Sequence, residues 1–323
     1  MIAAEHLRVR VRPGFSIAAL LRGQGRKPLD ILVDVSLAVA PGETLAIVGE
    51  SGSGKTTLGR VLNGLVRPVA GTVRFDGQAL DPRASDRKLR PLRHKVAMIF
   101  QDAVGSLDPR LRVRDLVVEP LRIQGVRPAP DAAEALLAQV GLPAILAERY
   151  PHELSGGQAR RVTVARSLAV PPRLIICDEP TAGLDVSVQA EIVNLLADLQ
   201  RRLGIAYLLI THDLPVARRV SRRIAIMYLG SIVETGPTER VFAGPRHPYS
   251  RALFQAEPSR DPTCRPPPPL DGEVPSLQQR PPGCVFQTRC PQVQDLCRRA
   301  APEEREIAPN HLVRCHFPLE AAP

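Results

Sequence analysis

Long apolar runs are missing from this sequence. None of its segments reaches the roughly 18 consecutive apolar residues that a transmembrane helix needs. The first segment, Met1–Arg12, carries charges throughout and lacks the apolar core of a secretory signal. We therefore expect neither a transmembrane helix nor a signal peptide, and we expect the chain to stay in the cytosol. Any role at a membrane must then come through a partner.

Lysine is scarce, although the net charge is +10. Only four of the 43 basic residues are Lys, and the Arg residues are scattered along the chain, partly as doublets. Examples are Arg160-Arg161, Arg201-Arg202 and Arg222-Arg223. This distribution favours a solvated surface with general affinity for anions over a nucleic-acid-binding patch. Heptad runs, which would predict long coiled-coil arms, are also missing.

Closely spaced cysteine pairs are missing as well. Of the six cysteines, four follow the spacing C-x5-C-x6-C-x17-C: Cys284, Cys290, Cys297 and Cys315. Zinc sites usually contain a C-x2-4-C pair, and disulfides are disfavoured in a reducing cytosol. The four thiols therefore indicate a metal centre. Their spacing suits an iron–sulfur cluster at least as well as a zinc ion. Free thiols remain the alternative.

Short apolar runs that alternate with helical patterns predict an α/β fold with a largely parallel sheet. Strand signals vanish between residues 103 and 170, where helical spacing predicts a helical insert. After Arg246 the chain becomes rich in Pro, Cys and Arg. We predict a nucleotide-binding domain over residues 1–245 and a small loop-rich extension over residues 246–323.

A glycine-rich loop carries the first chemical motif. The spacing G-x-x-x-x-G-K-T follows an apolar run at Thr44–Val48, and it lets backbone N–H groups wrap the phosphates of a nucleotide. Lys55 is expected to reach the β- and γ-phosphates, and the Thr56 hydroxyl to bind Mg²⁺. An ordinary strand-to-helix turn is the weaker alternative. The residues expected to bind ATP here are Gly49, Ser51, Gly52, Ser53, Gly54, Lys55, Thr56 and Thr57.

Two acidic residues end a later apolar run, Leu174–Asp178. An Asp at the end of such a strand can hold Mg²⁺ through water, and Glu179 follows where a general base could polarise the attacking water. Alone, this pattern would more often be a strand end with two surface acids. After a phosphate loop, we expect Asp178 to bind the cofactor and Glu179 to be the base.

A second possible anion site lies at Ser155, Gly156, Gly157 and Gln158, directly before a helical pattern. Since one loop already holds the nucleotide, a second phosphate-binding surface favours a composite site in which each chain caps the nucleotide of another. The alternative is a plain helix start with Ser155 as the N-cap.

The string LSGGQ at residues 154–158 beside a phosphate loop resembles the ATP-binding cassette (ABC) family. The resemblance implies a RecA-like core, an antiparallel β subdomain and a helical subdomain. It makes Gln101 the glutamine that contacts Mg²⁺ and water and senses a membrane partner. It places Asp185 at a dimer interface and makes His212 the γ-phosphate switch. Phe15, the one aromatic residue before the glycine loop, becomes the candidate that stacks on adenine, with an ordinary core residue as an equal alternative.

The tail resembles the extension of oligopeptide, dipeptide and nickel importer ATPases, through His247-Pro248-Tyr249, Pro266–Pro269 and Pro282-Gly283-Cys284. This implies an ATPase that energises peptide uptake through two separate membrane permease subunits. The ATPase itself would be a peripheral protein at the cytoplasmic face of the inner membrane. The resemblance further implies a second, different ATPase subunit, an extracellular solute-binding protein and a [4Fe–4S] cluster on the four cysteines. Uptake of nickel or another small solute is the alternative, and a soluble ABC ATPase acting on nucleic acid is less favoured.

Overall fold

The structure, a computed structural model, describes residues 1–11, 28–81, 84–257 and 275–320. Phe15, the candidate adenine-stacking residue, lies outside these ranges. The chain divides into two compact units. The first combines residues 1–38, 45–83 and 212–323, and the second combines residues 39–44 and 84–211.

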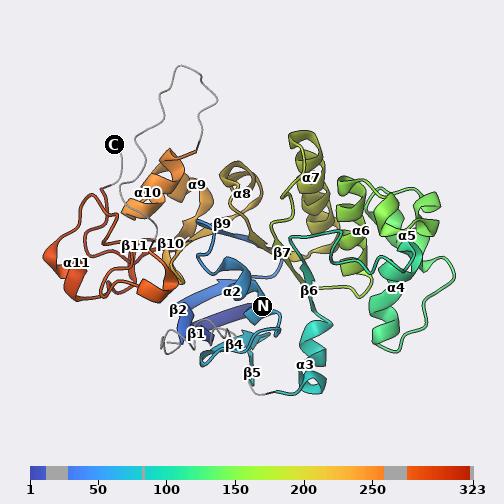
Figure 1. The fold of residues 1–323 in the computed structure, drawn as a ribbon, viewed down its shortest axis with the longest axis horizontal. Helices are drawn as coiled ribbons and strands as arrows, with labels where there is room; N and C mark the ends of the chain where they lie inside the picture. The colour runs from blue at the N-terminus through green and yellow to red at the C-terminus, as the bar shows by residue number, and fades with distance from the viewer. Residues whose placement is uncertain (12–27, 82–83, 258–274, 321–323) are drawn as a thin grey trace, which may run out of the picture. The chain divides into compact units, whose positions relative to one another are not determined.

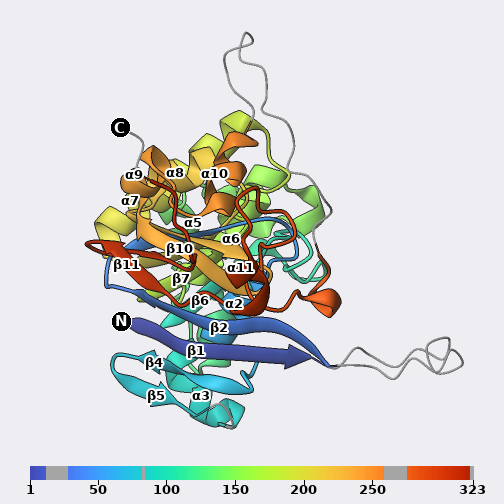
Figure 2. The ribbon, with the colours of Figure 1, turned by 90° about the vertical axis from the view of Figure 1, so that its left-hand side faces the viewer.

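A four-stranded antiparallel sheet forms one layer of the first unit, in the order β2-β1-β4-β5 (Figure 2). Its strands are β1 (Ile2–Val11), β2 (Leu29–Val39), β4 (Ala70–Phe75) and β5 (Gln78–Leu80). Apolar side chains such as Leu7 and Val9 alternate with exposed ones along β1, so one face of the sheet is buried. This sheet is the predicted antiparallel β subdomain.

The second sheet of this unit surrounds the phosphate loop. The strand β3 (Thr44–Val48) pairs in parallel with β9 (Arg223–Tyr228), and β10 (Ser231–Pro237) pairs with β9 in antiparallel fashion. The strands β12 (His311–Val313) and β11 (Arg305–Ala308) then extend the sheet beyond β10 (Figure 1). The end of the chain is therefore built into the same sheet as β3.

Short helices complete the first unit. They are α2 (Lys55–Leu62), α8 (Leu214–Val220), α9 (Thr238–Ala243), α10 (Pro248–Gln255), η3 (Leu277–Gln279) and α11 (Asp295–Arg299). Tyr228, Tyr249 and Phe286 pack together in the core, with ring centroids 4.5 to 5.4 Å apart. Since Phe286 belongs to the tail, the tail shares this core rather than forming one of its own.

Three parallel strands form the sheet of the second unit: β6 (Val96–Ile99), β7 (Leu174–Asp178) and β8 (Ala206–Ile210). The strands β7 and β8 are buried along their whole length, which explains their continuous apolar sequences. The helix α3 (Asp86–Arg93) precedes β6, and α7 (Val186–Leu203) follows β7. The helix α7 ends at Gly204, whose φ of 66° suits glycine.

Only helical elements lie between β6 and β7, where every residue is described (Figure 1). They are α4 (Val113–Ile123), α5 (Ala132–Gln139), η1 (Ala144–Glu148), η2 (Pro151–Glu153) and α6 (Gly156–Leu168). The predicted α/β class with an antiparallel sheet and a helical region is confirmed. None of the helices in the described ranges is long and apolar enough to cross a membrane.

Candidate functional site

The phosphate loop follows β3 and runs into α2. Gly49 has a φ of 150°, and a Cβ there would lie 2.1 Å from the carbonyl oxygen of Met227. Only glycine fits such a close approach. Lys55 donates from Nζ to the carbonyl oxygens of Gly49 at 2.7 Å and Glu50 at 2.9 Å, so its ammonium group lies over the loop.

The side chain of Ser53 indicates that this loop binds a ligand. This side chain is 4% exposed, and its buried Oγ has no hydrogen-bond partner among the described residues. A buried hydroxyl without a partner is costly, and the oxygen of a bound phosphate would satisfy it. The first turn of α2 begins at Lys55, two residues later, and its N–H groups favour anions. The loop therefore fits the phosphates of a nucleotide.

Asp178 is the last residue of β7 and Glu179 follows it directly, as the sequence predicts. Both are buried, and Glu179 has a φ of 51°, a left-handed conformation that is strained for a residue with a side chain. Its N–H donates to the carbonyl oxygen of Ile210 at 2.8 Å, which helps to hold that conformation. Strain of this kind concentrates at functional sites. Cys177 precedes them, and burial raises the pKa of its thiol to about 12, so it stays protonated.

Ser155 and Gln158 form a capping box at the start of α6. Ser155 Oγ accepts from the N–H of Gln158 at 3.2 Å, and Gln158 Oε1 accepts from the N–H of Ser155 at 3.0 Å. Ser155 is thus an N-cap, and it is also exposed, with Gly156 beside it. A Cβ on Gly157 would lie 2.8 Å from Val188 Cγ1 of α7, which explains the second glycine.

Asp185 caps α7, where its Oδ1 accepts from the N–H of Val188 at 2.9 Å. Hydrogen bonds from the Ser187 hydroxyl and from Val188 lower the pKa of the Asp185 carboxyl. Val186, the first residue of the helix, is a large apolar side chain that is 82% exposed. The start of α7 therefore presents a charged cap and an apolar side chain to the outside of this unit.

Arg160 is a feature that the sequence interpretation missed. Its place in an Arg doublet indicated a solvated side chain, but it is 3% exposed, so that interpretation is wrong for this residue. It donates from Nη1 to the carbonyl oxygen of Phe100 and from Nη2 to that of Gln101, both at 2.8 Å. Burial lowers the pKa of its guanidinium. Arg160 thus ties the helix α6 to the backbone of the predicted sensor glutamine.

The predicted site residues fall into both units. The first unit contains the phosphate loop and His212, which is exposed before α8. The second unit contains Gln101, which is exposed after β6, and the residues of the Ser155 and Asp178 regions. The roles of these side chains in ATP binding and hydrolysis remain predictions from the sequence.

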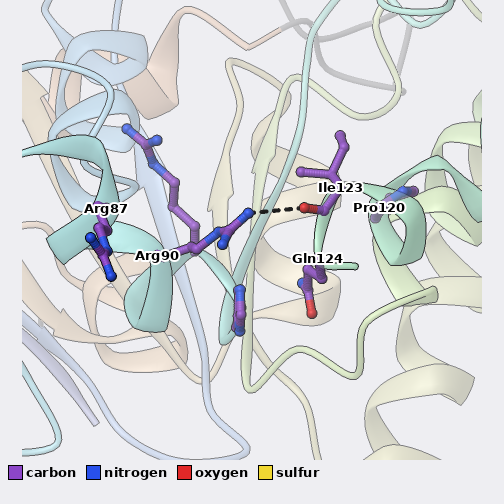
Figure 3. Close-up of a pocket in the computed structure, with 7 residues that line it drawn as sticks. Arg87, Arg90, Pro120, Ile123 and Gln124 are labelled. Carbon is purple, nitrogen blue, oxygen red and sulfur yellow. Dashed lines mark hydrogen bonds between the residues drawn. The ribbon is translucent and has the colours of Figure 1, made fainter. Parts of the chain in front are cut away.

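A cavity of about 480 Å³ lies between α3 and α4 of the second unit (Figure 3). Its lining combines cationic and apolar side chains: Arg87, Arg90, Arg93, His94, Pro120, Ile123 and Gln124. Arg90 donates from Nη2 to the carbonyl oxygen of Ile123 at 3.1 Å, which joins the two helices across the cavity (Figure 3). The Ile123 side chain itself is well exposed.

The four tail cysteines are free thiols in the structure and are partly or fully buried. The Cys284 N–H donates to the carbonyl oxygen of Cys297 at 2.8 Å. Burial raises the pKa of the Cys284 and Cys315 thiols to about 11, and the other three cysteines contribute to the shift of Cys315. Among the described residues, no three His, Cys, Asp or Glu side chains are arranged to hold a metal ion.

Comparisons with known proteins agree with this fold and loop. A family model described as ABC transporter matches residues 32–182, and one described as oligopeptide/dipeptide transporter, C-terminal region, matches residues 233–297. Putative peptide import ATP-binding proteins of Brucella abortus and Brucella ovis are 47% and 45% identical over 296 and 291 residues. These alignments cover 91% and 89% of this chain, and 88% and 92% of the relatives.

Solved structures give the same result. A dimeric post-hydrolysis structure of the ATP-binding cassette MJ0796 bound to ADP and Pi is similar, with a TM-score of 0.64 and 29% identity. The match covers 74% of this chain and 99% of that chain. The protein cbiO1 from Clostridium perfringens, part of the ABC transporter complex cbiONQ, gives a TM-score of 0.62 and 28% identity, over 75% and 90% of the two chains.

The fold and the phosphate loop define a P-loop ATPase of the cassette type. The chain belongs to the ABC transporter family, among the members that carry the oligopeptide/dipeptide transporter C-terminal region. The predicted family is thereby confirmed. The chain is an ATP-hydrolysing subunit that uses ATP and Mg²⁺ and works with a membrane permease.

Proposed function

We propose that this chain energises the import of di- and oligopeptides through a separate membrane permease. The observation that carries the proposal is the tail. The C-terminal region of oligopeptide/dipeptide transporters matches residues 233–297, and the relatives that are 45–47% identical are named putative peptide import ATP-binding proteins. An extracellular solute-binding protein would deliver the peptide, and the ATPase would lie at the cytoplasmic face of the membrane.

We propose these roles in hydrolysis. The loop from Gly49 to Thr57 binds the phosphates, with Lys55 on the β- and γ-phosphates. Thr56 and Gln101 would hold Mg²⁺ with support from Asp178, and the ion would supply neutralisation of the phosphate charge. Glu179 polarises the attacking water, and His212 holds the γ-phosphate. The buried Ser53 hydroxyl and the strained backbone of Glu179 support these assignments.

Two ATPase chains would complete each other's sites, and we propose that the second chain is a different subunit. Ser155 and Gly156 are exposed at the start of α6, where N–H groups can meet the phosphate of a neighbour's nucleotide. The exposed Val186 next to Asp185 supports a protein interface at the start of α7.

In this proposal the nucleotide-binding cassette spans residues 1–245, with a helical subdomain over residues 103–170, and the tail spans residues 246–323.

The cavity between α3 and α4 is the surface that we propose for the permease. Three Arg side chains beside the exposed Ile123 suit a short helix with an apolar face and acidic ends. Arg90 joins α3 to α4 at this cavity, and Arg160 of the same unit holds the backbone of Gln101. A permease that moves α3 and α4 would therefore act on the unit that positions Gln101.

We also propose that the four tail cysteines hold a [4Fe–4S] cluster, with zinc as the alternative. The donor set suits such a cluster in its chemistry, since the tail supplies four cysteine thiols that are partly or fully buried. A bound cluster would supply a crosslink between segments of the tail. Anaerobic purification should give a brown protein with broad absorbance near about 400 nm and bound iron and sulfide. A colourless protein loaded with zinc would contradict the cluster.

Uptake by reconstituted transporters tests the peptide proposal. The chain, its partner ATPase and the permease are placed in proteoliposomes with the solute-binding protein and labelled dipeptides, pentapeptides or Ni²⁺. We expect ATP-dependent uptake of peptide, and loss of uptake with Glu179→Gln. ATP-dependent uptake of Ni²⁺ without uptake of peptide would contradict the peptide proposal and would assign the transporter to metal import.

A further inference from the structure

Glu50, the second residue of the phosphate loop, is held by two residues of the tail, residues 246–323. Arg289 donates from Nη1 to both carboxylate oxygens of Glu50, at 3.1 and 3.0 Å. The backbone N–H of Glu50 donates to the hydroxyl of Tyr249 at 3.0 Å. These partners lie 239 and 199 residues away in sequence, and all three residues belong to the first unit.

The ion pair between Glu50 and Arg289 differs from the surface pairs of the chain. The Arg289 side chain is 9% exposed and that of Glu50 28%, and the guanidinium lies 6.0 Å from the centroid of Tyr228. Water screens such a pair less than it screens an exposed one. The pair of Arg299 with Asp295 in the same tail is the contrast, with a 4.0 Å separation and side chains 81% and 85% exposed.

Arg289 is also held in place by its surroundings. It directly precedes Cys290, and its N–H donates to the carbonyl oxygen of Phe286 at 3.1 Å. Phe286 is fully buried against Tyr228 and Tyr249. The guanidinium therefore projects from a short loop, residues 284–290, which the aromatic core holds through Phe286 and which the Cys284 N–H joins to the carbonyl oxygen of Cys297.

Glu50 in turn contacts the residues that bind phosphate. Its carbonyl oxygen accepts from Lys55 Nζ at 2.9 Å and from the N–H of Ser53 at 3.2 Å. A shift of the Glu50 backbone would move the acceptor of Lys55 and one end of the turn that carries Ser53. The position of Glu50 thus sets the geometry of the loop.

We propose that Arg289 is a positioning residue that fixes the phosphate loop for ATP through Glu50. The cysteine-flanked loop 284–290 thereby controls the affinity of the ATPase for nucleotide. A shift of that loop would move Arg289 and Glu50, and it would therefore change the contacts that Lys55 and Ser53 make with the phosphate loop. The inference depends on ATP binding alone and needs neither peptide transport nor a metal cluster.

The test uses the full-length chain with the variants Arg289→Gln, Glu50→Gln and the double variant. A fluorescent ATP analogue reports affinity, and steady-state hydrolysis gives KM and kcat. Arg289→Gln should weaken nucleotide binding and raise KM by at least about fivefold, the lower end of common coupling between sites. The kcat at saturating ATP should change less than about twofold. The matched control Arg299→Gln, which breaks an exposed pair in the same tail, should leave KM unchanged.

A double-mutant cycle separates positioning from general damage. If Arg289 acts through Glu50, the double variant binds ATP no more weakly than Glu50→Gln alone. Equal KM values for Arg289→Gln and Arg299→Gln would overturn the proposal, and so would additive losses in the cycle. If Arg289→Gln does not fold, Arg289→Lys carries the test, because one ammonium cannot copy the guanidinium contact. It should raise KM less than Gln would but above the control, and an unchanged KM would overturn the proposal.

Discussion

Replacement of Arg160 by methionine removes two hydrogen bonds that join α6 to the backbone of Phe100 and Gln101. Methionine has a similar length and keeps the apolar contacts of the side-chain stem. The change therefore isolates the guanidinium. If Arg160 holds the Gln101 loop in place, both the stability and the turnover of the ATPase depend on it.

The size of the effect follows from the contacts. Hydrogen bonds to a charged group contribute about 1.5–3 kcal/mol each, so the two bonds together set an upper limit of about 3–6 kcal/mol. Two terms reduce that figure. Burial of the guanidinium is unfavourable, as its lowered pKa indicates, and Gln101 is exposed, so its carbonyl oxygen can regain water. We expect a net loss of about 2 kcal/mol, well within the stability of an ordinary domain.

Urea unfolding followed by circular dichroism measures the stability, since the chain has no Trp to report by fluorescence. We expect kcat to fall about tenfold, which corresponds to about 1.4 kcal/mol in the barrier. The KM for ATP should change less than kcat, because the guanidinium of Arg160 bonds the backbone of Phe100 and Gln101 and not the residues of the phosphate loop. Arg161→Met is the matched control, since Arg161 lies next in α6 but contacts Val140 and Glu191 instead. Equal kcat values for the two variants would refute the role of Arg160.

Three further predictions concern single residues. His247 Nδ1 accepts a hydrogen bond from the N–H of Tyr249, and burial lowers the pKa of the imidazole from 6.5 to about 4. Between these two pH values the folded chain binds fewer protons than the unfolded chain. The free energy of unfolding therefore falls by at most about 3 kcal/mol as the pH drops from 6.5 to 4. His247→Asn keeps an acceptor and should lose less in urea unfolding at pH 5 than at pH 7 relative to wild type; an equal loss would contradict this. Gly49→Ala should abolish binding of a fluorescent ATP analogue while the chain stays folded, because its Cβ would meet the Met227 oxygen; retained affinity would be contrary to the loop geometry. Ser155→Ala should cost about 1 kcal/mol in stability and impair the partner's ATP site in a mixed dimer; full activity there would count against a shared site.

Local spacing made the chemistry of this chain predictable. The glycine loop, the capping box of Ser155 and the strand that ends at Asp178 are each contained in fewer than ten residues, and the structure places each in the expected local setting. Their chemistry depends on neighbours along the chain, so the sequence carries it directly. The parallel strands were equally clear, because strands buried on both faces have continuous apolar sequences.

Contacts between distant segments were not predictable. Arg160 lies in a doublet that is typical of a solvated surface, and its partners are about 60 residues away. Arg289 and Glu50 are 239 residues apart, and no periodicity relates them. The tail likewise reads as loop-rich, although Phe286 enters a core formed with Tyr228 and Tyr249. Such features arise from tertiary packing, which pattern and propensity do not encode.

The measurement that tests the central claim most directly is ATP turnover by Glu179→Gln in the assembled transporter. Glutamine keeps the size of the buried side chain but cannot act as a base. The account predicts that hydrolysis falls by at least about a hundredfold, the common contribution of a general base, while binding of a fluorescent ATP analogue is retained. Undiminished hydrolysis by this variant would contradict the assignment of Glu179 and the mechanism built on it.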